Sequence, residues 1–87
     1  FDKRANELLS RINDITASLK RYETKIKSAS TEDRLVLQLQ IYKLRTQLID
    51  DIHKLADALL DLEKSGPQPQ LRAKVEDVFA RITPQLW

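Results

Sequence analysis

Residues 31–64 read TEDRLVLQLQIYKLRTQLIDDIHKLADALLDLEK and contain neither glycine nor proline. Leucine, isoleucine and valine recur in this stretch every three or four positions, which is the spacing of one face of an α-helix. Ser30 and Thr31 are both residue types that cap the N-termini of helices. We therefore predict one long helix from about Thr31 to Lys64.

Two separate apolar stripes run along this predicted helix. The first stripe consists of Leu37, Ile41, Leu44, Leu48, Ile52, Leu55, Leu59 and Leu62. The second stripe consists of Leu35, Leu39, Tyr42, Ile49, Ala56 and Leu60, with Thr46 and His53 in the same row. The stripes lie well over ~100° apart around the helix axis, so the helix needs packing partners on two sides.

The preceding segment, residues 1–29, has an unbroken heptad pattern. Its apolar positions alternate in steps of four and three, and they are Phe1, Ala5, Leu8, Ile12, Ile15, Leu19, Tyr22, Ile26 and Ala29. A seam of this kind suits a helix that packs along another helix. Residues 28–33 predict a tight turn, so the seam meets the first stripe in an antiparallel hairpin. Arg4 and Arg11 then face the acidic end of the second helix, which favours this register.

The last quarter of the chain holds every glycine and proline. Gly66 and Pro67 are expected to end the second helix, because Gly66 can take a left-handed conformation and Pro67 cannot continue a helix. Pro69 is placed to open a third helix. The apolar residues of that helix are Leu71, Val75, Val78, Phe79 and Ile82.

Thr83 and Pro84 predict a cap and the first turn of a fourth helix. The predicted fold class is all-α, an open three-helix bundle. Residues 1–64 form a long antiparallel helical hairpin of coiled-coil type. Residues 65–87 form a linker, a shorter third helix and the start of a truncated fourth helix.

The third helix is too short to cover the whole second stripe. Packing back from the turn, it reaches Leu60, Ala56, His53 and Ile49. Leu35, Leu39 and Tyr42 lie beyond its end, so we predict that they form an uncovered apolar strip that contacts another chain or missing parts of the parent protein. Two simpler interpretations stay open: the third helix is shifted, or a modest exposed strip is tolerated.

Composition excludes several kinds of chemistry. The chain has no cysteine, which rules out disulfides, thiolate nucleophiles and cysteine-based zinc sites. Its one glycine rules out a glycine-rich phosphate loop. Hydrophobic residues make up 41% and charged residues 32%, with a net charge of +2 and mixed signs, which is typical of a soluble surface. We predict neither an enzyme nor a cofactor.

His53 is the single histidine, and Asp50 and Asp57 lie near it on roughly one side of the predicted helix. Three such groups could hold a metal ion. Helical bundles that bind metals draw further carboxylate ligands from other helices into the core. The pattern offers few such ligands, so a partly buried histidine beside solvated aspartates is the favoured interpretation, and no metal site is predicted.

A basic cluster consists of Lys20, Arg21, Lys25 and Lys27, with Tyr22 among them. Tyr22 occupies a heptad d position, so it is expected to pack against the second helix rather than stack on a base. Basic residues at a helix C-terminus are also favoured by the helix dipole. We therefore predict no binding to nucleic acid.

Two stretches carry a resemblance to a known family. They are KIKSASTEDR at residues 25–34 and IHKLADALLDLEKSG at residues 52–66. They resemble the soluble helical segments that precede the pore region in bacterial mechanosensitive channels of the small-conductance type. The resemblance spans most of the chain as a style of helix, and it carries over no functional residue. It implies a soluble, non-catalytic portion of a membrane protein.

The functional prediction is a non-catalytic structural or protein–protein interaction module. The chain begins at Phe1 and contains no methionine, so we interpret it as part of a larger protein. Its expected partner is a protein, either a second copy or the rest of the parent chain, and a membrane only through missing parts of that parent. The alternative function is a soluble regulatory segment of a membrane channel or transporter.

Overall fold

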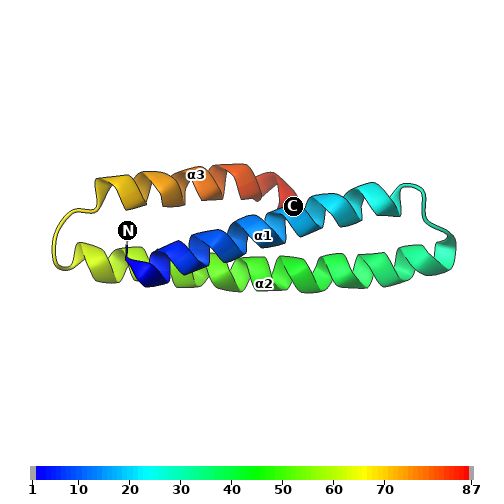
Figure 1. Cartoon of the computed structure of the whole chain (residues 1–87), viewed down its shortest axis with the longest axis horizontal. Helices are drawn as coiled ribbons and strands as arrows, with labels where there is room; N and C mark the ends of the chain where they lie inside the picture. Colours follow the sequence, from blue (N-terminus) through cyan, green and yellow to red (C-terminus); the bar gives the residue numbers. More distant parts are fainter. Residues whose placement is uncertain (1, 87) are drawn as a thin grey trace.

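The computed structural model describes the backbone of residues 2–86 and the side chains of residues 2–82. Within this part the chain forms three helices and no strand: α1 (Lys3–Ile26), α2 (Thr31–Glu63) and α3 (Pro69–Leu86). They make a rod of 52 × 19 × 17 Å (Figure 1). The predicted all-α class, a long hairpin with a shorter third helix, is confirmed. Phe1 and Trp87 lie outside the described residues.

Local capping explains where α1 and α2 begin. The side chain of Asp2 accepts a hydrogen bond from the backbone N–H of Arg4 at 2.7 Å. The Ser30 hydroxyl oxygen accepts one from the backbone N–H of Asp33 at 3.2 Å, so Ser30 is the cap of α2. Each bond satisfies a helix donor that would otherwise have no partner within the helix. The turn between the helices is therefore sharp although it contains no glycine.

The core of the hairpin lies where the heptad seam of α1 meets the first stripe of α2. Its buried members are Ala5, Leu8, Ile12 and Leu19 from α1 and Ile41, Leu48, Ile52, Leu55 and Leu59 from α2. Ion pairs between the two helices occur at three places along the rod, namely Arg4–Asp61 at 3.5 Å, Arg11–Asp51 at 3.0 Å and Arg45–Glu23 at 3.8 Å. These pairs agree with the predicted antiparallel register.

The connection from α2 to α3 is built as the sequence predicts. Gly66 has a φ of +152°, a conformation that residues with a side chain rarely adopt. Helix α3 begins at Pro69. Its residue Arg72 donates hydrogen bonds to both carboxylate oxygens of Glu63, from Nε to Oε2 at 2.9 Å and from Nη2 to Oε1. This bidentate ion pair links the start of α3 to the end of α2.

The position of α3 differs from the prediction. Leu60, His53 and Ile49 are exposed and Ala56 is half-buried, so the expectation that α3 covers these residues is wrong. Instead, the buried residues of α3 join the core that α1 and α2 already share, and they are Leu71, Val75, Val78 and Ile82. The physical reason is that a narrow apolar seam buries more surface in an existing groove than on a separate face. Helix α3 covers about half of the rod (Figure 1).

The predicted start of a fourth helix at Thr83 and Pro84 is also wrong. The structure has one continuous helix, α3, through both residues to Leu86. Proline lacks a backbone N–H, so it removes one hydrogen bond from a helix. Near the end of α3 the loss of a single bond does not force a break.

The Glu63–Arg72 pair predicts a pH dependence of stability. Hydrogen bonds from Arg72 hold the pKa of Glu63 below its ordinary value of 4.5. A carboxyl with a lowered pKa in the folded state contributes stability that is complete above pH 4.5 and is lost as the pH falls through the lowered pKa. We expect Glu63→Gln to lower the Tm at neutral pH, and the difference from wild type to vanish in strong acid.

The matched control is Asp77→Asn, which removes the same charge from an exposed pair with Arg81 at 3.1 Å within α3. Such pairs contribute little, so its Tm should stay close to that of wild type. Thermal melts by circular dichroism at several pH values make the comparison. A Glu63→Gln deficit that is equally large in strong acid would contradict the prediction.

Candidate protein-interaction surface

The predicted interface residues lie side by side on the outer side of α2. Leu35 is 66% exposed, Leu39 52% and Tyr42 69%. They belong to the α2 segment nearest the α1–α2 turn, which α3 does not reach (Figure 1). Val36 is exposed as well and adjoins Leu35. Val36 belongs to neither apolar stripe, so its exposure was not predicted, although its place next to Leu35 in the sequence was an available signal.

The same row continues toward the other end of α2. We call the whole set the outer row, and it consists of Leu35, Leu39, Tyr42, Thr46, Ile49, His53, Ala56 and Leu60. Ile49 and Leu60 are exposed even though α3 lies along this half of the rod. The Thr46 hydroxyl donates to the Tyr42 carbonyl oxygen at 3.0 Å, so its proton is satisfied within the helix. The outer row is therefore largely apolar along its whole length.

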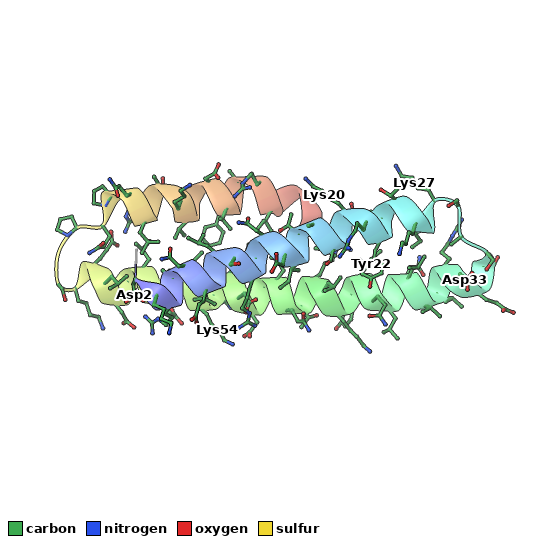
Figure 2. The ribbon with its side chains drawn as sticks, viewed as in Figure 1. Asp2, Lys20, Tyr22, Lys27, Asp33 and Lys54 are labelled. Atoms are coloured by element: carbon green, nitrogen blue, oxygen red, sulfur yellow. The ribbon has the colours of Figure 1, made fainter. Side chains whose placement is uncertain are left out.

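Tyr22, which lies among the basic residues of the cluster, packs against the core instead of pointing into solvent. Tyr22 is half-buried against the core. The Nζ atom of Lys25 lies 5.8 Å from the centroid of its ring, within range of a cation–π contact. Figure 2 shows Tyr22 on the side of α1 that faces α2. The expected packing role of Tyr22 is confirmed.

His53 and its neighbours Asp50 and Asp57 do not form a metal-binding cluster. His53 is exposed, and the Asp50 carboxylate pairs with Lys54 at 3.1 Å. Within the part of the chain that the structure describes, no three histidine or acidic side chains gather closely enough to hold a metal ion. The arrangement therefore gives no basis for metal chemistry at this position.

One buried charge was missed by sequence reasoning. Asp51 is 0% exposed, and its Oδ1 lies 3.0 Å from Nη2 of Arg11, whose side chain is 59% exposed. Neither carboxylate oxygen has a well-formed hydrogen bond to any described residue. The available signal was the seven-residue spacing that places Asp51 in line with Leu44 and Ala58, on the side of α2 that faces the core. Arg11 is thus its main electrostatic compensation.

A shallow groove of about 510 Å³ lies beside this ion pair. It is lined by Arg4, Glu7, Leu8, Arg11, Lys54, Asp57 and Asp61. Its lining contains three cationic and three acidic residues, so it has no single sign of charge that would attract one class of ionic ligand. The outer row is the stronger candidate for a functional surface.

Comparison of the chain with protein-family models, curated proteins and solved structures finds no match. Among the described residues, no helix is both long enough and apolar enough to cross a membrane. The functional proposals below therefore rest on the surface itself. The resemblance to channel segments stays a hypothesis from the sequence.

We expect the loss of Arg11 alone to destabilise the protein more than the loss of both Arg11 and Asp51. Arg11→Met leaves a buried carboxylate without its partner and should cost about 3 kcal/mol. Asp51→Leu removes that carboxylate, and combining it with Arg11→Met should recover most of the loss. Arg4→Met is the control, because its partner Asp61 is exposed, and it should cost less than about 1 kcal/mol. Urea denaturation measures all four variants, and equal losses for Arg4→Met and Arg11→Met would refute the prediction.

Proposed function

We propose that this chain is a non-catalytic helical module that binds another protein through the outer side of α2. The observation that carries the proposal is the run of Leu35, Leu39 and Tyr42, each more than half exposed and adjacent on one helix face. Large apolar side chains that are contiguous and exposed mark interaction surfaces more often than single exposed residues do.

The core is supported without these residues, which favours a binding role for them. Every buried side chain of α2 lies on the side that faces α1 and α3. Charged residues flank the strip, including Glu32, Asp33 and Lys43, all of them exposed. An apolar centre with a charged rim is the usual composition of a protein–protein interface.

The proposal that the module is non-catalytic rests on its side-chain chemistry. The sequence supplies no cysteine and a single histidine. That histidine, His53, is exposed on the outer row. Nucleophilic catalysis needs a nucleophile and a base held within hydrogen-bond reach of each other, and His53 has no such serine or threonine in its sequence context.

The second candidate is a soluble regulatory segment of a membrane channel or transporter. It differs from the first in what surrounds the chain within its parent protein. Membrane-spanning segments on either side of these residues in the parent sequence would favour it, and their absence would favour the general interaction module.

Substitutions in the strip should separate binding from folding. Leu39→Lys and Tyr42→Lys should each change the free energy of unfolding of the monomer by no more than about 0.5 kcal/mol, because both side chains contact water in the single chain. Ile41→Lys is the matched control, since Ile41 is only 7% exposed, and an uncompensated buried charge should cost about 3–5 kcal/mol. Urea denaturation gives the three values.

Binding is then measured on the folded variants. The immobilised wild-type chain should retain a protein partner, whether another protein or a second copy, and both lysine variants should release it. Retention that is equal for wild type and the two variants would overturn the proposal. So would a stability loss for Leu39→Lys as large as that of Ile41→Lys, because the strip would then belong to the core.

A further inference from the structure

The outer row has the spacing of a coiled-coil seam. From Leu35 to Leu60 its steps alternate between four and three residues without interruption. The span of about 25 residues corresponds to roughly 38 Å at ~1.5 Å per residue. The first stripe, by contrast, takes two successive four-residue steps at Leu48. A regular heptad row matches another α-helix lying along it, so the chemistry of the occupant is that of a helix.

A second α2 fits this row in the antiparallel direction. The heptad a positions of the outer row are Leu39, Thr46, His53 and Leu60, and its d positions are Leu35, Tyr42, Ile49 and Ala56. In the antiparallel orientation each a position faces a d position of the partner helix. The layers then pair Leu35 with Leu60, Leu39 with Ala56, Tyr42 with His53, and Thr46 with Ile49, each from opposite copies. Every layer contains at least one apolar side chain. Two copies packed in this way are related by a two-fold axis, so each pair of residues occurs twice.

Charges beside the row select this register. Lys43 and Asp50 each follow a d position and are both exposed on the same flank of α2. In the register above, Lys43 of one copy lies beside Asp50 of the other, and the contact occurs twice. A shift by one heptad places Lys43 beside Lys43 of the other copy. Like charges in contact disfavour that alternative.

The charge along the whole rod favours the same orientation. Residues 20–45 form the end that contains the α1–α2 turn, and they carry seven Lys or Arg and three Asp or Glu. The remaining residues carry eight Lys or Arg and ten Asp or Glu. Antiparallel packing brings the basic end of one copy against the acidic end of the other, whereas parallel packing brings like ends together.

From these observations we propose that the occupant of the outer row is a second copy of this chain, packed antiparallel on α2 about a two-fold axis between residues 47 and 48. This inference rests on the proposed function and names its partner. The dimer buries the outer rows of both copies and leaves the core of each unchanged.

Disulfide trapping tests the orientation, because the natural chain contains no cysteine. Equal amounts of Leu35→Cys and Leu60→Cys, one carrying a mass tag, are mixed and mildly oxidised, and the products are identified by mass spectrometry. The mixed dimer should dominate over the two like dimers. Lys74→Cys, on an exposed position of α3, is the control and should form no disulfide-linked dimer. Predominance of like dimers would refute the antiparallel arrangement.

Charge exchange tests the register without introduced thiols. Lys43→Asp places acidic groups beside Asp50 of the other copy and should weaken association about tenfold. Adding Asp50→Lys to the same chain restores opposite charges and should restore association. Light scattering over a concentration series gives the mass of each variant, and circular dichroism checks that each is folded. A double variant as weak as Lys43→Asp would contradict the register.

The outcomes separate this inference from the proposed function. A wild-type chain that stays monomeric at every concentration, yet retains a partner that Tyr42→Lys releases, would refute the second copy and leave the proposed function standing. A monomeric chain with no partner that depends on Tyr42 would refute both. A dimer that Tyr42→Lys dissociates, with mixed disulfides dominant, supports both.

Discussion

The packing of α1 along the first stripe of α2 is the interaction on which the rest of the structure depends. Ala5, Leu19 and Leu48 are completely buried in it, and it runs along most of the rod. Most helical stability in proteins comes from packing of an apolar face against other elements, and α3 finds that packing in the groove between the other two helices. The end of the rod beyond α3 is held by the α1–α2 seam and by the Arg45–Glu23 ion pair.

This arrangement gives α2 two largely apolar sides, and each side contains different polar residues. The side that faces the core contains Asp51, whose charge is compensated by Arg11 at the surface. The outer row contains Thr46 and His53 among apolar neighbours. A polar residue within an apolar row tends to specify pairing and register at some cost in stability. In the proposed dimer, Thr46 and His53 are the polar positions that would distinguish one alignment of the outer rows from another.

Charge pattern acts at two length scales in this chain. Single ion pairs such as Arg4–Asp61 join particular residues of the hairpin, and each exposed pair contributes little. The unequal distribution of charge between the two ends of the rod acts over a longer range, and in the proposed dimer it favours the antiparallel direction. An elongated shape increases this effect because it keeps the two ends apart.

The α1 and α2 helices, the cap at Ser30 and the register of the hairpin followed from the sequence, because each depends on neighbours within a few positions or on the phase of a heptad. The exposure of Leu35, Leu39 and Tyr42 was also predicted, but its physical reason differs: α3 packs into the core shared with α1 and leaves even Ile49 and Leu60 of the same row exposed. Only the tertiary structure decided that α3 joins the shared core and that Asp51 is buried. Both outcomes depend on which surfaces, far apart in the sequence, bury the most apolar area when they pack together. A local sequence pattern does not report how much area each possible packing would bury.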